Sequence, residues 1–149
     1  MLTKTPPKAG RARAKAIRHF IDLDQLSAPA LRHIIDMAHT MKRAGKRTPK
    51  ELRPANIKDA VLAMIFEKPS TRTRVSFDLA MRQLGGQTIP LNHLDLQTGR
   101  GEPVSDTAKV LSRYVDAIML RANKHETLLE YAAHATIPVI NGLTDQSHP

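Results

Sequence analysis

A dense group of hydrogen-bonding side chains directly follows a run of apolar residues near the middle of the chain. It consists of hydroxyl and guanidinium groups: Ser70, Thr71, Arg72, Thr73 and Arg74. A guanidinium group can hold two phosphate oxygens at once, and hydroxyl groups add further donors. Arginine near the start of a helix opposes the helix dipole, at a cost of about 0.3–1 kcal/mol, so stability alone does not explain both arginines. The segment therefore indicates a phosphate-binding site.

The element that precedes this group determines how it could bind. Residues 60–66 form a continuous apolar run, which is typical of a strand buried on both faces. A strand that turns directly into a helix leaves the first helical N–H groups unpaired, and these donors attract an anion together with the helix dipole. A simpler interpretation also stays open, in which Ser70 caps a surface helix whose arginines pair with Glu67 and Asp78.

Segments typical of strands and helices alternate along the chain. A helix capped by Ser27, with an apolar stripe from Leu31 to Met41, comes first. Strands are expected at residues 60–66, 87–91, 116–121 and 137–141, with a helix after each of the first three. Short connections between alternating elements predict a single-domain α/β fold, in which a four-stranded parallel sheet carries helices on both faces and is thus doubly wound.

In open sheets of this kind, ligands bind beyond the carboxyl ends of the strands. This rule selects the group at 70–74, then Gln97, Arg121 and His148. Each has a simpler interpretation: Gln97 as a residue of a flexible loop, Arg121 in a surface ion pair and Arg74 as a brace for its loop. The histidines on helices are expected to face solvent or to cap: His33, His39, His125 and His134.

Composition excludes several kinds of chemistry. The chain has 149 residues, enough for one domain, and contains no cysteine, so disulfides, thiolate nucleophiles and sulfur-ligated zinc are ruled out. The seven histidines show no metal-binding spacing, so we expect no metal site. No stretch approaches the roughly 18–20 apolar residues that a membrane helix needs. We expect a cytoplasmic protein that has no contact with a membrane.

The net charge of +9 is concentrated at the start of the chain. Residues 1–18 contain no acid, and the remainder carries 17 basic and 14 acidic residues, an excess of only three. We expect a disordered basic leader and no nucleic-acid partner. The alternative, a nucleic-acid binder that acts through this leader, predicts binding that weakens steeply with salt. A nucleotide-binding domain is less favoured because neither glycine-rich phosphate fingerprint is present. The leader's basic residues are Lys4, Lys8, Arg11, Arg13, Lys15 and Arg18.

The segment "FEKPSTRTRVSFD" closely resembles the carbamoyl-phosphate signature Ser-x-Arg-Thr-Arg of the carbamoyltransferase family. The resemblance continues through "GRGEPVSDTAKVLSRYVDAIMLR" and "IPVINGLTDQSHP", and it covers nearly all of residues 19–149. His148 and Pro149 match the first two residues of the family's His-Pro-x-Gln motif. Lys68, "DTAKVLSRY" and "NGLTD" resemble the ornithine-specific members more than the aspartate-specific ones.

The resemblance implies a role for each matching residue. Arg72, Arg121 and His148 would be catalytic: Arg121 would bridge the phosphate and the carbamoyl oxygen, and His148 would donate to that oxygen. Gln97 would reach the ligand of a neighbouring subunit. The carbamoyl-phosphate-binding residues would be Ser70, Thr71, Arg72, Thr73, Gln97, Arg121, His148 and Pro149.

The resemblance also implies how the chain is organised. Residues 19–149 would form the carbamoyl-phosphate-binding domain of a homotrimeric enzyme that needs no cofactor or metal. A second domain, which would bind ornithine, is absent from the sequence. We expect the isolated chain to bind carbamoyl phosphate without turning it over. Specificity for aspartate or another amino acid, in place of ornithine, stays an alternative.

Overall fold

A parallel sheet of four strands lies at the centre of the computed structural model, which describes residues 19–45, 57–92, 96 and 101–149. Strand β1 (Val61–Phe66) pairs with β2 (Gln87–Asn92) on one side and with β3 (Ala117–Arg121) on the other. Strand β4 (Val139–Asn141) pairs with β3, so the order is β2-β1-β3-β4. The predicted parallel sheet is confirmed, with strand ends within two residues of those expected.

The two inner strands are apolar because each has a strand on both sides and helices over both faces. Their side chains alternate between two clusters, as the two-residue period of a strand requires. Ala63, Ile65 and Ile118 pack on one side with α3 and α4, whereas Met64 and Met119 pack on the other with α2. The side chains of Ile118 and Met119 are fully buried.

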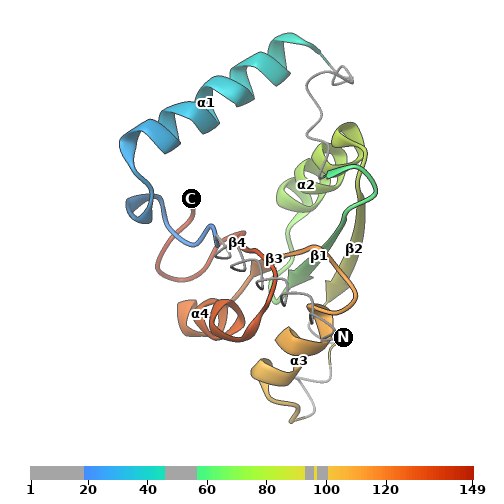
Figure 1. Cartoon of the computed structure of the whole chain (residues 1–149). Coiled ribbons are helices and arrows are strands. Elements are labelled where there is room, and N and C mark those ends of the chain that lie inside the picture. Colours follow the sequence, from blue (N-terminus) through green and yellow to red (C-terminus); the bar gives the residue numbers. More distant parts are fainter. Residues whose placement is uncertain (1–18, 46–56, 93–95, 97–100) are drawn as a thin grey trace, which may run out of the picture.

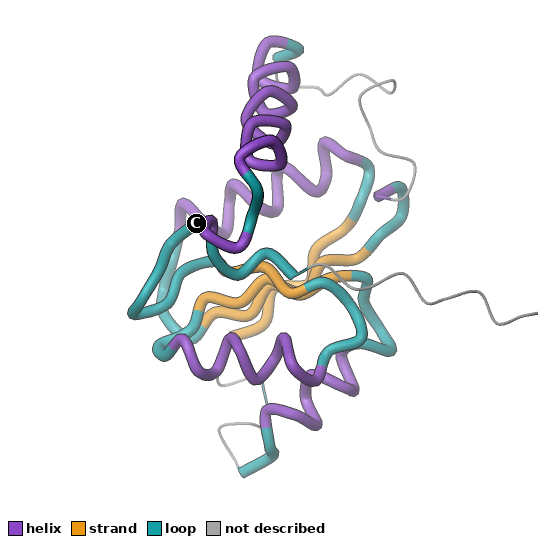
Figure 2. Tube along the Cα trace, turned by 60° about the vertical axis from the view of Figure 1, so that its left-hand side comes forward, coloured by secondary structure: helices purple, strands orange, loops and turns teal. Residues whose placement is uncertain are grey.

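The helices cover both faces of the sheet (Figures 1 and 2). Helix α2 (Thr71–Leu84) lies on one face, and α3 (Val104–Leu111) and α4 (His125–His134) lie on the other. The predicted doubly wound arrangement is therefore confirmed. The chain passes from β1 to β2 in one direction and then returns to β3, so the strand order reverses between β1 and β3. A crevice that suits a ligand is expected at this point.

Helix α1 (Ala28–Arg43) begins where the sequence predicts, because Ser27 accepts a hydrogen bond from the N–H of Ala30 at 3.4 Å. Its apolar stripe does not face the sheet. Ile34 and Ile35 are each 44% exposed, and the helix buries none of its residues (Figure 1). The stripe thus predicts the helix correctly but does not pack against the described part of the chain.

The segment before α1 lies along the outer edge of β4. The N–H of Phe20 donates to the carbonyl of Val139, and the N–H of Asn141 donates to the carbonyl of Phe20, both at 2.8 Å. The short helix η1 (Leu23–Gln25) follows. The predicted leader, residues 1–18, lies outside the described residues.

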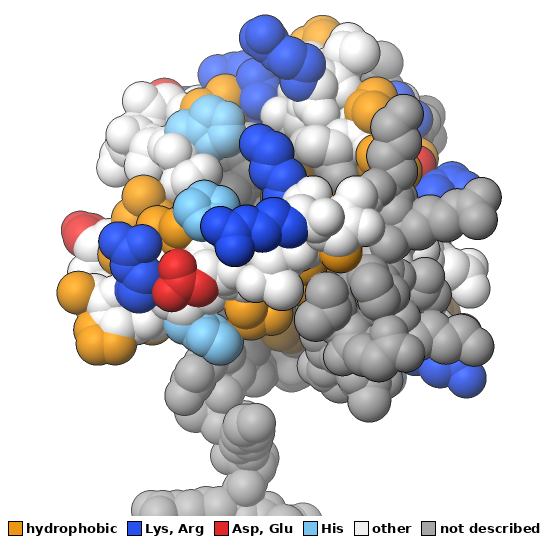
Figure 3. Space-filling view, turned by 90° about the horizontal axis from the view of Figure 1, so that it is seen from above, with side chains coloured by type: hydrophobic (Ala, Val, Ile, Leu, Met, Phe, Trp, Pro, Cys, Tyr) orange, Lys and Arg blue, Asp and Glu red, His pale blue; other side chains and the backbone are white. Residues whose placement is uncertain are grey.

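Two further features of the described residues concern the charge on the surface and the length and apolarity of the helices. Lys, Arg and His side chains gather on the face seen in Figure 3, where few acidic side chains are visible. No helix in the described ranges is both long enough and apolar enough to cross a membrane.

Candidate functional site

A cavity of about 700 Å³ opens beyond the carboxyl ends of β1 and β3, where the strand order reverses. Three segments that are far apart in the sequence line it: the start of α2, the end of β3 and the loop after β4. Its lining consists of Pro69, Ser70, Thr71, Arg72, Thr73, Ser76, Arg121, Leu143 and His148. Most of the residues predicted from the strand-end rule therefore meet in one place.

The start of α2 presents backbone donors to this cavity. Ser70 occupies the N-cap position with an extended backbone, but its hydroxyl accepts no hydrogen bond from the helix. The first-turn N–H groups have no partner within a helix, so they and the helix dipole remain directed toward the space beyond Thr71. The interpretation that Ser70 is present only to cap the helix does not fit this geometry.

The two acids that could have paired with the arginines form their hydrogen bonds with other residues. Glu67 accepts a hydrogen bond from the N–H of Asn123 at 2.6 Å and so joins the loops after β1 and β3. Asp78 forms an ion pair with Arg82 at 2.9 Å and accepts a hydrogen bond from the hydroxyl of Thr88. The hydrogen bonds from Thr88 and Arg82 lower the pKa of Asp78.

Arg121 reaches the cavity from the last residue of β3. Its Nη1 donates to Thr73 Oγ1 at 3.3 Å, and this bond connects the strand end to the first turn of α2. Its Nε is buried and has no partner among the described residues. A buried donor without a partner destabilises a protein by about 1–3 kcal/mol, so the arrangement around Arg121 favours an added acceptor.

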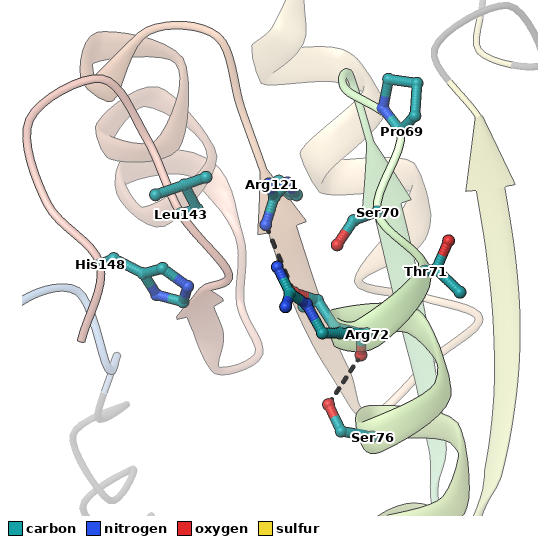
Figure 4. A pocket seen from close by; sticks show the side chains of 9 residues that line it. Pro69, Ser70, Thr71, Arg72, Ser76, Arg121, Leu143 and His148 are labelled. Atoms are coloured by element: carbon teal, nitrogen blue, oxygen red, sulfur yellow. Dashed lines mark hydrogen bonds between the residues drawn. The ribbon is translucent and has the colours of Figure 1, made fainter.

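The charged side chains converge on a shared space. In Figure 4, Arg72 and Arg121 lie on one side of the cavity and His148 approaches from the other. Among the described residues, no Asp or Glu lines this cavity. Two guanidinium groups and a helix N-terminus without a nearby acid create a positive potential, which attracts a multiply charged anion.

Arg74 lies on the opposite flank of the α2 start, away from Arg72. It lines a second hollow together with Glu67, Lys68 and Asn92. This placement separates Arg74 from the first cavity. The role expected for it, bracing the loop, remains a prediction.

Of the other two predicted site residues, Gln97 and Pro149, only Pro149 is among the described residues, and it does not line the first cavity. Gln97 lies outside the described residues. Pro149 lines a smaller hollow of about 260 Å³, together with Asp22 and Ser147.

His125 corrects an expectation, because it does not face solvent. The residue begins α4 but is only 7% exposed, and its Nδ1 lies 3.0 Å from Thr144 Oγ1. Burial arises from contacts with distant segments, which the local pattern of the helix does not reveal. Sequence reasoning also missed Pro69, Ser76 and Leu143 in the cavity lining. Ser76 lies four residues after Arg72 and so on the same helix face, a spacing that could have identified it.

Comparison with known proteins relates this chain to one family. The family described as aspartate/ornithine carbamoyltransferase, carbamoyl-P binding domain, matches residues 18–149. The chain is 60% identical over 132 residues to an ornithine carbamoyltransferase of Rhizobium meliloti, which covers 89% of the chain and 43% of that relative. It is 58% identical over 138 residues to that of Brucella suis, covering 93% and 43%. The chain thus spans less than half the length of these curated relatives.

Solved structures agree with this relationship. Ornithine carbamoyltransferase from Pyrococcus furiosus superposes with a TM-score of 0.80 at 47% identity, over 90% of this chain and 42% of that one. The anabolic enzyme from Campylobacter jejuni gives 0.79 at 44% identity, over 89% and 41%. The fold, the cavity beyond the strand ends and these matches lead to one conclusion: this chain is a carbamoyl-phosphate-binding domain of the aspartate/ornithine carbamoyltransferase family.

Proposed function

We propose that this chain is the carbamoyl-phosphate-binding half of an ornithine carbamoyltransferase. Such an enzyme transfers the carbamoyl group of carbamoyl phosphate to the side-chain amine of ornithine and releases citrulline and phosphate. The observation that carries the proposal is the convergence of Arg72, Arg121 and His148 on one cavity that no described acid lines. The relatives reported above are named for ornithine, which favours this substrate over aspartate.

In this proposal the phosphate group binds at the start of α2. The first-turn N–H groups, the hydroxyls of Ser70, Thr71 and Thr73, and the guanidinium of Arg72 surround it. Each is a hydrogen-bond donor, and the helix dipole adds to the attraction for a dianion. The phosphate binds because these groups are held at one turn by the strand that ends at Phe66.

The carbamoyl group then lies between Arg121 and His148. The neutral amine of ornithine attacks the carbonyl carbon, a C–N bond forms, and negative charge develops on the carbonyl oxygen. The bond from carbon to the bridging oxygen breaks, phosphate leaves with the electron pair, and the departing phosphate accepts the proton that the amine releases. Donors directed at the oxygen stabilise charge where it develops, and removing one such donor typically raises the barrier by about 2.7–4 kcal/mol. These steps need no metal or cofactor.

The rest of the proposal concerns the parent protein. A second domain binds ornithine and closes over the cavity, and the parent is a cytoplasmic homotrimer that acts in arginine metabolism. Gln97 approaches the ligand of a neighbouring subunit, and Pro149 belongs to the motif that begins with His148. The isolated chain binds carbamoyl phosphate but does not turn it over.

The proposal is tested by ligand-induced stabilisation. We expect carbamoyl phosphate to raise the melting temperature of this chain, since a ligand that binds only the folded state stabilises it by about 2.7 kcal/mol at 100 times its Kd. Arg72→Ala should abolish the rise. Arg82→Ala, which removes a cation from the other end of the same helix, should retain it. Chloride at matched ionic strength controls for screening, and an unshifted wild-type melting curve would contradict the proposal.

A further inference from the structure

The hydroxyl of Thr144 lies at the centre of the loop that leads from β4 to His148. It accepts hydrogen bonds from the N–H groups of Gln146 and Ser147, each at 3.2 Å. The N–H of Thr144 itself donates to the carbonyl of Ser147 at 3.0 Å. Because Thr144 is only 5% exposed, these bonds are largely shielded from water. The loop therefore closes on Thr144 just before His148.

His125 completes the bonding of this hydroxyl. In the uncharged form of the ring, the proton lies on Nε2, because Nε2 is 3.4 Å from Asp22 Oδ2 and a carboxylate only accepts. Nδ1 is then an acceptor, and it lies 3.0 Å from Thr144 Oγ1. The hydroxyl proton has two acceptors within reach, Nδ1 of His125 at 3.0 Å and the carbonyl oxygen of Ser147 at 3.4 Å, and the hydroxyl oxygen lies closer to Nδ1.

Three further bonds hold the same loop to the body of the domain. The N–H of His125 donates to Asp145 Oδ1 at 2.8 Å. Asn141 Nδ2 donates to Ser147 Oγ and to the carbonyl of Ile21, each at 2.9 Å. The loop is thus attached to the start of α4 and to the segment before α1, at residues on both sides of Thr144.

His148 itself is an exposed residue at the rim of the cavity (Figure 4). Within the described residues, no hydrogen bond to its ring is found, so the preceding loop sets the position of the ring. A donor stabilises developing charge only when it is held within about 0.5 Å of its productive position. Holding it there requires support from the residues that pack around it.

We infer that Thr144, held by His125, is a positioning residue that places His148 against the carbamoyl group. The inference rests on the proposed function. It adds that two segments recognise the two ends of the ligand: the start of α2 binds the phosphoryl end, and the loop around Thr144 recognises the carbamoyl end. Loosening the loop should therefore weaken binding of a ligand that carries a carbamoyl group and leave binding of a bare phosphoryl group unchanged.

Two stable ligands separate these contributions in calorimetric titrations of the whole chain. Phosphonoacetamide has the phosphoryl and carbamoyl groups of carbamoyl phosphate joined through a methylene, and methylphosphonate has only the phosphoryl end. We expect the wild type to prefer phosphonoacetamide by about tenfold, the size of one well-placed hydrogen bond. Thr144→Val, which replaces the hydroxyl with a methyl group, should lose this preference as fully as His148→Ala does. Thr144→Ser, which keeps the hydroxyl, should retain it.

A second pair of variants tests the same contact from the other side. His125→Asn keeps an amide at the place of Nδ1 and should retain the preference, whereas His125→Leu should lose it. If Thr144→Val retains the preference for phosphonoacetamide, or if it weakens the binding of both ligands equally, the inference is overturned. The proposed function stands in either case. No binding of either ligand by the wild type would overturn the proposed function, and the inference with it. Arg72→Ala should weaken the binding of both ligands equally, because both carry the phosphoryl group that Arg72 is proposed to bind.

Discussion

Arg121 illustrates how a strand end prepares a side chain for a ligand. The three residues before it, Ile118 to Leu120, are fully buried, which fixes the backbone from which the side chain leaves the sheet. The bond from Nη1 to Thr73 Oγ1 then fixes part of the guanidinium group. A side chain that is ordered before binding loses less conformational entropy when the ligand arrives. The geometry therefore favours tight recognition by a small number of groups.

His19 should make stability depend on pH. Burial lowers the pKa of His19 below its ordinary value of 6.5, and its Nδ1 accepts a hydrogen bond from the N–H of Val139 at 3.2 Å. The unfolded chain therefore takes up a proton first as the pH falls, and the stabilisation is lost below about pH 6.5. His19→Asn keeps an acceptor but does not titrate. We expect a smaller fall in the free energy of unfolding, between about pH 7.5 and 5.5, in this variant than in the wild type.

Urea denaturation at the two pH values measures this difference. Other groups titrate in the same range in both proteins, so only the difference between wild type and variant reports on His19. An identical fall in both proteins would show that His19 contributes nothing to the pH dependence.

At the level of single residues, the sequence predicts the site residues that lie beyond the carboxyl ends of the strands. Arg72, Arg121 and His148 follow strands, and the structure brings them to one cavity. The burial of His125 could not be predicted, because it depends on Thr144, nineteen residues later, and on Asp22, far earlier in the chain. Nothing in the local pattern of helix α4 indicates those contacts.

At the level of elements, two adjacent glycines end α2 for different physical reasons. Gly85 has a φ of +92°, and an added Cβ would have no atom within 4 Å. The backbone conformation alone therefore favours glycine there. Gly86 has no such φ, but an added Cβ would lie 2.8 Å from the carbonyl oxygen of Ala60. We expect Gly86→Ala to destabilise the domain by about 1–3 kcal/mol, the usual penalty of overpacking.

Gly85→Asn is the matched comparison for Gly86→Ala. Asparagine tolerates the left-handed conformation better than most residues, so this variant should lose less stability. Chemical denaturation of both variants measures the difference. A smaller loss in Gly86→Ala than in Gly85→Asn would show that β2 can move away from Ala60.

Elements with local signals were predicted well, and their packing was not. Ser27 and Pro29 mark the start of α1, and Gly85 marks the end of α2, because capping and turn chemistry act over a few residues. The exposed apolar stripe of α1 shows the limit. Periodicity identifies the apolar face of a helix but carries no information about what covers that face.

At the level of the whole molecule, the proposed trimer should form through the flank made by α2 and β2. Because Gln97, proposed to reach a neighbouring subunit, follows β2 in the sequence, we expect the neighbour to lie on that side. Val75 and Leu79, which lie four residues apart on one face of α2, are 59% and 51% exposed. Exposed apolar groups that lie near one another are typical of protein interfaces.

Light scattering after size-exclusion chromatography tests this surface. We expect a particle of about 50 kDa, three times the 16.5 kDa of one chain. Leu79→Asp should convert it to a monomer, because a charge in the interface would lose its hydration. Leu129→Asp, a similar change at a 45% exposed leucine of α4, should leave it intact. A monomeric wild type would show that the domain does not assemble alone.

The pairing of Phe20 with β4 has a practical consequence for any shortened form of this protein. One residue, bonded on both sides to Val139 and Asn141, shields the outermost strand from solvent. A chain trimmed past that residue would leave backbone groups free to recruit strands from other molecules. A truncation that starts at Asp22 should therefore precipitate more readily than one that retains His19, even though every helix and every residue of the first cavity is kept.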